Sequence, residues 1–354
     1  MTQMKNERGK ACSIILLIIL ALSLSCSKID YVMPVSGSVD IYLAGSKISG
    51  PDSVRSATYW KNGIPTSLTN GSANSSLFAI VVSGKDVYTA GYVGDTLKYW
   101  KNKVGVIVGR DSLFAGAMAI FGSHVYLAGG IKHIITANNF SVIKTVATYW
   151  KDGVAFSLPI ESDALQSYAA SITVSGEDVY VVGRELRTNG LHPKLWKNGN
   201  SIDVTVDSLY TQFESITISG TDIYLAGTTG NSFTQQVATY WKNGVAFSLS
   251  TDPVATLSKA SSIAVSGADI YVAGWERNNN GVIVAKYWKN GVPTILTDGT
   301  ISQEAYSIAV SGNDVYVTSD GTIPNSSTLW KNGKVVPPFD GTNNQAYAYG
   351  LWIN

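Results

Sequence analysis

Apolar and polar residues alternate in short runs along this chain, and one pattern of runs recurs seven times. Its clearest copy reads SSIAVSGADIYVAG at residues 261–274, followed by a polar insert and then AKYWKNGVPTIL at residues 285–296. Alternation with a period of two is typical of half-buried β-strands. We therefore expect four strands in each copy, which we name A to D in chain order.

Two tight turns separate these strands. Strands A and B are joined by Ser-Gly-x-Asp, and we expect its aspartate, such as Asp269, to cap the turn by accepting backbone hydrogen bonds. Strands C and D are joined by Asn-Gly, the strongest short hairpin signal, because a type I′ turn needs positive φ at both central residues. Copy two has Asn102-Lys103 instead, which predicts a distorted or wider turn.

The spacing of the copies predicts the architecture. One tyrosine of strand B recurs about every 46 residues, a period that is typical of propeller blades, at Tyr42, Tyr88, Tyr126, Tyr180, Tyr224, Tyr271 and Tyr316. We expect an all-β, seven-bladed β-propeller of four-stranded antiparallel blades. The tryptophan that precedes each C–D turn, such as Trp288, is expected in the core between blades. An open β-solenoid is the alternative.

The architecture resembles that of kelch and WD40 proteins, without their signatures. The Gly-His and Trp-Asp pairs of WD40 repeats are absent, and the Gly-Gly of kelch blades follows strand B only at Gly129-Gly130. The resemblance therefore implies a fold and no particular activity.

The chain ends predict how the ring closes. Residues 346–353 lie where an eighth strand A would fall, so we expect them to form the innermost strand of the first blade. The N-terminal candidate for this place, residues 31–36, contains Pro34, which lacks the N–H that an internal strand donates. The alternative is that the N-terminal strand closes its own blade. With the C-terminal strand closing the ring, we expect the propeller to span residues 37–354.

The first residues resemble a bacterial lipoprotein signal. A basic start with Lys5, Arg8 and Lys10 precedes an apolar run, residues 13–24, that is too short to span a bilayer. The resemblance, which is to exported lipoproteins of the Bacteroidetes type, implies a signal peptide at residues 1–25 and lipidation of Cys26. Residues 26–36 would be a tether, and the protein would lie in the cell envelope as an outer-membrane or periplasmic lipoprotein. An ordinary secretory signal with an incidental cysteine is the alternative.

The loops between strands indicate which face binds a ligand. The A–B turns hardly vary, whereas the stretches between strands B and C vary more than twofold in length, the longest being residues 130–149. Since loops on a rigid scaffold carry function, we place a ligand site on the face of the B–C and D–A loops. The expected ligand-binding residues directly follow strand B (Tyr92, Arg184, Trp275, Asp320) or directly precede strand A or its closing equivalent (Phe78, Glu214, Tyr306, Tyr349).

Composition excludes several functions. The formal net charge is +1 and no basic cluster interleaves with aromatic residues, which argues against nucleic acid. With three histidines and no mature cysteine besides Cys26, we expect neither a metal nor another cofactor. We expect a monomeric, non-catalytic binding or scaffold module for a carbohydrate, a peptide or an envelope protein, attached to the membrane through its lipid alone. The alternative is a glycan hydrolase or lyase that uses carboxylates on the variable loops, such as Glu161 with Asp163 or Glu214 with Asp207.

Overall fold

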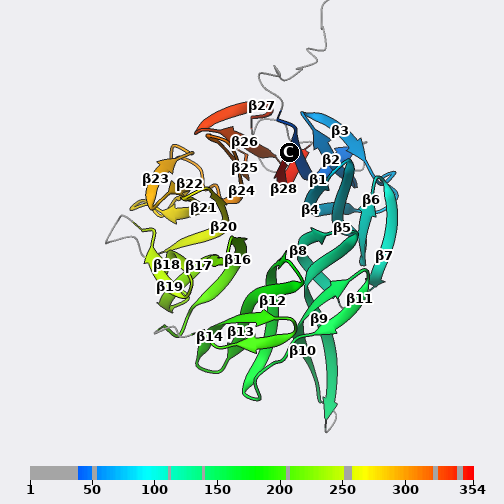
Figure 1. Ribbon diagram of the computed structural model, residues 1–354, viewed down its shortest axis with the longest axis vertical. Coiled ribbons are helices and arrows are strands. Elements are labelled where there is room, and N and C mark those ends of the chain that lie inside the picture. The colour runs from blue at the N-terminus through cyan, green and yellow to red at the C-terminus, as the bar shows by residue number, and fades with distance from the viewer. Residues whose placement is uncertain are drawn as a thin grey trace, which may run out of the picture. The chain divides into compact units, whose positions relative to one another are not determined.

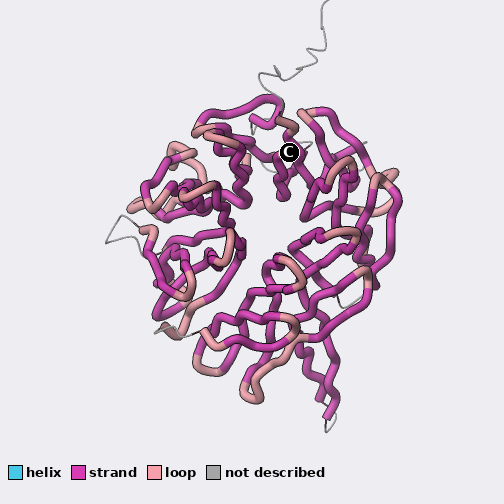
Figure 2. The backbone as a smooth tube through the Cα atoms, in the orientation of Figure 1, coloured by secondary structure: helices cyan, strands magenta, loops and turns pink. Residues whose placement is uncertain are grey.

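The chain folds into a ring of seven β-sheets. The computed structural model describes residues 39–49, 54–110, 113–137, 140–204, 208–250, 257–321, 326–340 and 346–354. Within them, seven four-stranded antiparallel sheets surround a central axis as blades, and nearly all of the backbone is strand or tight turn (Figures 1 and 2). This is the predicted seven-bladed β-propeller. The expected signal peptide, Cys26 and the tether lie outside the described residues.

Each blade runs from an inner strand A to an outer strand D. Blade 1 consists of β28 (Ala346–Ile353), β1 (Ile41–Ser49), β2 (Val54–Lys61) and β3 (Ile64–Ser67). Blade 2 consists of β4 (Ser75–Ser83), β5 (Asp86–Val93), β6 (Thr96–Lys101) and β7 (Val104–Arg110). Blade 3 consists of β8 (Leu113–Phe121), β9 (His124–Ala137), β10 (Phe140–Lys151) and β11 (Val154–Ser157).

The remaining four blades follow the same order. Blade 4 consists of β12 (Ala164–Ser175), β13 (Asp178–Arg187), β14 (Gly190–Lys197) and β15 (Asn200–Ile202). Blade 5 consists of β16 (Gln212–Ser219), β17 (Asp222–Ser232), β18 (Gln235–Lys242) and β19 (Val245–Ser248). Blade 6 consists of β20 (Ser258–Ser266), β21 (Asp269–Arg277), β22 (Ile283–Lys289) and β23 (Val292–Ile295). Blade 7 consists of β24 (Ala305–Ser311), β25 (Asp314–Asp320), β26 (Ser327–Lys331) and β27 (Lys334–Asp340).

The two ends of the propeller meet in blade 1. Strand β28 pairs antiparallel with β1, from Ile41 opposite Ile353 to Lys47 opposite Ala346. The C-terminal strand is thus the innermost strand of the first blade, in the place that the spacing of the copies indicated. Because the last strand completes the first blade, unfolding either one opens the ring.

The core lies between blades, as the tryptophan pattern predicted. One cluster joins Tyr42 and Ala57 of blade 1 to Leu77, Ile80 and Trp100 of blade 2. The tryptophans before the C–D turns are at most 4% exposed in six blades, namely Trp60, Trp100, Trp150, Trp196, Trp241 and Trp288. Each blade therefore stabilises its neighbour, mainly through removal of apolar surface from water.

The C–D turns are more uniform than the sequence predicted. In blade 6, Asn290 and Gly291 both have positive φ, 49° and 82°. In blade 2, Asn102 and Lys103 have φ of 47° and 74° and join strands in the same two-residue register. The expectation of a distorted or wider turn there is wrong, because the surrounding hairpin imposes a conformation that costs a lysine only about 1–2 kcal/mol.

The expected role of the turn aspartates is also wrong. In blade 2 the asparagine of the C–D turn takes the backbone bond, since Asn102 Oδ1 accepts from Val87 N–H at 2.9 Å. Asp86 instead accepts from Asn102 Nδ2 at 2.6 Å and pairs with Lys101 at 2.8 Å, and that lysine lies over the ring of Tyr88. The same four-residue cluster recurs at the aspartates of five further blades, Asp40, Asp178, Asp222, Asp269 and Asp314.

Blade 3 builds the cluster from different residues. His124 replaces the aspartate and Asp152 replaces the asparagine. Asp152 accepts from Val125 N–H at 2.9 Å and lies 2.6 Å from His124 Nδ1. The face of A–B and C–D turns, which we call the repeated face, therefore presents nearly the same surface in all seven blades.

Candidate functional site

A β-bulge marks the same position in every inner strand. The register between strands A and B shifts by one residue there, and the extra residues are Phe78, Gly116, Ala170, Glu214, Ser261, Tyr306 and Tyr349. The sequence predicted that these residues directly precede strand A. That placement is wrong, because strand pairing continues before the bulge and the residues lie inside strand A. Tyr92, Arg184 and Trp275 likewise lie within strand B, and Asp320 ends it.

The bulge explains a recurring glycine in strand B. A Cβ atom on Gly183 would lie 1.8 Å from the carbonyl oxygen of Tyr168, just before the bulge. The equivalent distance is 1.7–2.1 Å at five other glycines, Gly45, Gly91, Gly129, Gly227 and Gly274. Blade 7 has Ser319 at this place. The close approach of the two backbones thus fixes the bulge next to the loops of the variable face, which we define as the face of the B–C and D–A loops.

Three charged side chains link blades 4, 5 and 6 on the variable face. Arg184 lies 3.7 Å from Glu214, and Glu214 lies 3.2 Å from Lys259. The guanidinium of Arg184 also lies over the ring of Tyr168, 5.3 Å from its centroid. All three ions keep part of their surface in water, with the side chain of Glu214 17% exposed. A ligand can therefore reach the chain of alternating charge.

A second polar group lies in blade 7. The hydroxyl of Tyr306 donates to Asp320 at 2.6 Å, and Asp320 also accepts from the backbone N–H of Glu304 at 3.3 Å. Burial and the bond to Asp320 raise the pKa of Tyr306. Burial raises the pKa of Glu304; the charge of Lys259 opposes this rise, the charge of Asp320 adds to it, and the nearby Trp275 opposes it. The predicted site residue Trp275 lies opposite Lys259 in the pairing of β20 with β21, and it is buried, with 8% of its surface exposed.

Aromatic rings continue the series into blade 1. Tyr306 and Tyr349 lie 5.8 Å apart between ring centroids, and Tyr349 stacks on Tyr347 at 5.3 Å. The guanidinium of Arg55 lies over Tyr347 at 5.1 Å. Burial raises the pKa of Tyr349, so its hydroxyl stays neutral.

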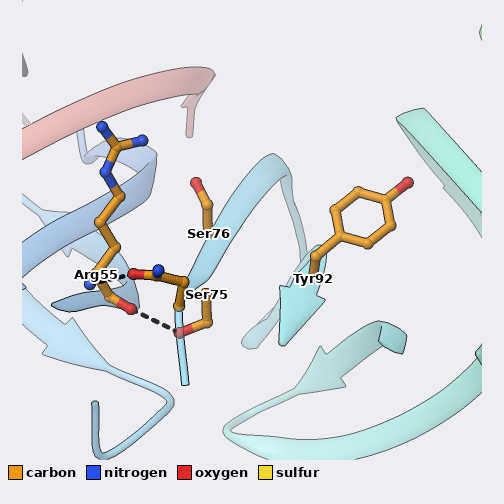
Figure 3. Close-up of a pocket in the computed structure, with 5 residues that line it drawn as sticks. Arg55, Ser75, Ser76 and Tyr92 are labelled. Atoms are coloured by element: carbon orange, nitrogen blue, oxygen red, sulfur yellow. Dashed lines mark hydrogen bonds between the residues drawn. The ribbon is translucent and has the colours of Figure 1, made fainter. Parts of the chain in front are cut away.

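A pocket follows between blades 1 and 2. It has a volume of about 460 Å³, and its described lining consists of Arg55, Asn74, Ser75, Ser76 and Tyr92 (Figure 3). Arg55 is the one charged residue in that lining. In Figure 3, Ser76 lies between the side chains of Arg55 and Tyr92.

Tyr92 has a structural contact as well. Its hydroxyl donates to the carbonyl of Ala115 in the next blade at 3.1 Å and lies in hydrogen-bond contact with the N–H of the same residue. Its ring lies 5.7 Å from that of Phe78, and burial raises its pKa to about 12. Tyr92 therefore offers a ligand its ring rather than its hydroxyl.

Most of the predicted site residues thus meet in separate groups on the variable face: Arg184 with Glu214, Tyr306 with Asp320 and Tyr349, and Phe78 with Tyr92. We call these groups together the belt. It comprises the predicted residues Phe78, Tyr92, Arg184, Glu214, Trp275, Tyr306, Asp320 and Tyr349, and the additional residues Arg55, Tyr168, Lys259, Glu304 and Tyr347. Of the additional residues, all but Arg55 precede the bulge by two positions. The copies differ there too, reading Ser76, Phe114, Tyr168, Gln212, Lys259, Glu304 and Tyr347. The variation among copies two positions before the bulge was the signal in the sequence for these residues.

The acidic pairs considered for catalysis have other partners. Glu161 lies 3.1 Å from Lys194, and Asp163 lies 3.6 Å from Arg187. Both cations also contact Glu185, which is fully buried, so this cluster joins the D–A loop to blade 4. Asp207 lies outside the described residues. Among the residues that the structure describes, no three of His, Cys, Asp and Glu group as metal ligands, and no helix is long and apolar enough to cross a membrane.

Known proteins share the fold of this chain. No family model matches the chain, and no curated protein matches it significantly. A puromycin-hydrolysing peptidase from Mycobacterium tuberculosis matches with a TM-score of 0.57 at 10% identity, over 89% of this chain and 54% of that one. A puromycin hydrolase matches with a TM-score of 0.54 at 9% identity, over 85% and 53%. This chain spans about half the length of those two proteins, and at such identities the likeness shows the propeller fold alone.

Proposed function

We propose that this protein is an exported, lipid-anchored carbohydrate-binding module without catalytic activity, which binds its ligand along the belt. The observation that carries the proposal is the contrast between the two faces. Six blades repeat one Asp-Asn-Lys-Tyr cluster on the repeated face, whereas the same backbone positions on the variable face carry a different side chain in nearly every blade. Positions that serve only the ring have no reason to differ in this way.

The chemistry of the belt suits a sugar. A pyranose has an apolar C–H face that stacks on an aromatic ring and hydroxyls that bind donors and acceptors. Tyr92, Tyr347 and Tyr349 provide partly exposed rings, and the ion pairs from Arg184 to Lys259 provide both donors and acceptors. The guanidinium of Arg55 adds hydrogen-bond donors at the pocket, which suit a sugar that bears a carboxylate, such as a uronic acid.

A binding assay with full-length purified protein tests this proposal. We expect a uronate-containing oligosaccharide at a hundred times its Kd to add about 2.7 kcal/mol of stability, which is about 5 °C in Tm. Arg55→Gln and Ser76→Phe should each abolish the shift, because the first removes the charge and the second fills the pocket. Arg110→Gln, which changes an exposed arginine on outer strand β7, is the matched control and should retain it. No shift with any acidic or neutral sugar would contradict the proposal.

The lipid anchor is tested separately. The proposal places the protein in the cell envelope through Cys26. Metabolic labelling with a fatty-acid analogue should label the wild-type chain and not Cys26→Ala, which should appear in the soluble fraction. Labelling that persists in Cys26→Ala would contradict the anchor and leave the binding proposal standing.

A second candidate, a glycan hydrolase or lyase, is favoured by one observation. Burial raises the pKa of Glu304, whose backbone N–H donates to Asp320, and a raised carboxyl pKa is the direction that a general acid requires. Mass spectrometry of the bound oligosaccharide separates the two functions. We expect the sugar to stay intact with the wild-type protein; cleavage that Glu304→Gln abolishes would establish the second candidate.

A further inference from the structure

Blade 3 carries an extension that the described residues of the other blades do not show. Strands β9 and β10 are 14 and 12 residues long, whereas strand B in the other blades has 7–11 residues. The two strands project from the ring as a two-stranded ribbon (Figure 1). We call its described outer part, residues 132–137 and 140–144, the arm.

The arm exposes apolar side chains on both of its faces. Ile134 and Ile143 are cross-strand partners, and they are 70% and 56% exposed. Val142, the residue before Ile143, lies on the opposite face of the ribbon and is 63% exposed. The corresponding B–C turns of blades 2 and 6 are polar, at residues 94–95 and 278–281. Exposed valines and isoleucines also occur on outer strands, such as Val292 at 68%, but in the arm two isoleucines lie opposite each other, which indicates a contact surface rather than a loop tip.

The backbone edges of the arm are available as well. Strand β8 pairs with β9 only as far as Ile131, and β11 pairs with β10 only from Thr148 onward. Between these limits, the described parts of β9 and β10 pair only with each other. An exposed strand edge with apolar side chains is a template to which an extended segment of another protein can add as a new strand.

The charge of blade 3 selects the chemistry of that segment. No acidic residue occurs between Asp111 and Asp152, whereas this stretch contains Lys132, His133 and Lys144. Each of the three is exposed or half-buried. A second copy of the chain would bring like charges together. A bilayer is also a poor match, because apolar residues on both faces would draw open backbone edges into hydrocarbon.

We propose that the arm is a docking site for an extended protein segment with alternating acidic and apolar residues, which adds to one of its edges as a β-strand. This goes beyond the proposed function, because it concerns a protein partner and a blade-3 surface distinct from the belt. The main-chain bonds supply the pairing, Ile134 and Ile143 cover the apolar side chains of the segment, and Lys132 and Lys144 pair with its carboxylates.

The test uses full-length protein and two blocked eight-residue peptides, one alternating glutamate with valine and one alternating lysine with valine. We expect the glutamate peptide to bind at least tenfold more tightly, and to protect the amides of residues 131–146 from hydrogen exchange. Ile134→Ser with Ile143→Ser should weaken binding at least tenfold. Val154→Ser with Val292→Ser, which changes valines that are 61% and 68% exposed on strands β11 and β23, is the matched control and should not.

Charge reversal makes the test sharper. Lys132→Glu with Lys144→Glu should exchange the preference, so that the lysine peptide binds more tightly. Equal binding of the two peptides, protection at other strand edges, or an unchanged preference after reversal would each overturn the proposal. Arm-dependent dimerisation, or arm-dependent binding to anionic vesicles without binding of the glutamate peptide, would assign the surface to a second copy or to lipid and overturn it equally.

Discussion

The close approach at the bulge predicts that Gly183→Ala destabilises the propeller. An added Cβ would lie 1.8 Å from the carbonyl oxygen of Tyr168, so β12 and β13 must separate by at least about 1.6 Å for an ordinary contact. Overpacking of this kind costs about 1–3 kcal/mol, and we expect the upper end because both atoms belong to the backbone of a sheet. Chemical denaturation should show a fall of about 3 kcal/mol in the free energy of unfolding, and Tm should fall by about 6 °C.

The same substitution should weaken ligand binding. Tyr168 lies under the guanidinium of Arg184, so displacing its backbone disturbs that part of the belt. Gly116→Ala is the matched control, because it places a methyl group at the bulge of blade 3 where no atom lies within 4 Å. It should change the free energy of unfolding by less than about 0.5 kcal/mol. If Gly183→Ala proved as stable as Gly116→Ala, the backbone contact would not be what requires glycine in strand B.

Three further predictions concern the charged residues and the exceptional turn. Lys103→Gly restores the residue that other C–D turns have and relieves a positive φ, so urea denaturation should show about 1 kcal/mol of added stability; a loss would contradict this explanation. Glu276→Gln leaves the side chain of Lys286, which is 13% exposed, without its buried carboxylate, and should cost about 3 kcal/mol. Adding Lys286→Met should recover most of that cost, and an additive double-mutant cycle would show that the two ions are not coupled. Lysine and asparagine neighbours hold the pKa of six aspartates on the repeated face below 3.8, namely Asp40, Asp86, Asp178, Asp222, Asp269 and Asp314. The aspartates therefore contribute fully to stability above about pH 4, and this contribution is lost as the pH falls further. Acid titration of unfolding should show this loss.

Blade count and closure could be predicted because they depend on periodic, local signals. Alternating apolar residues specify a strand, Asn-Gly specifies a hairpin, and seven copies leave a propeller as the compact way to bury seven sets of tryptophans. Even the position of the C-terminal strand follows from counting residues beyond Trp330. The turn at Lys103 shows the limit of this reasoning, since the local preference of one residue was overridden by the hairpin on either side of it.

The sequence by itself determined the strands, their turns, the number of blades and the positions at which copies differ. Each of these features depends only on residues that are close in the chain and on the spacing at which they repeat. Only the tertiary structure decided which of the variable positions meet. The contact of Glu214 with Arg184 and Lys259, and that of Tyr306 with Tyr349, join residues of different blades, and their geometry depends on how far each blade turns about the axis. The bulge, which places these side chains beside the loops, arises from the pairing of two strands, and only that pairing gives the recurring glycine of strand B its meaning.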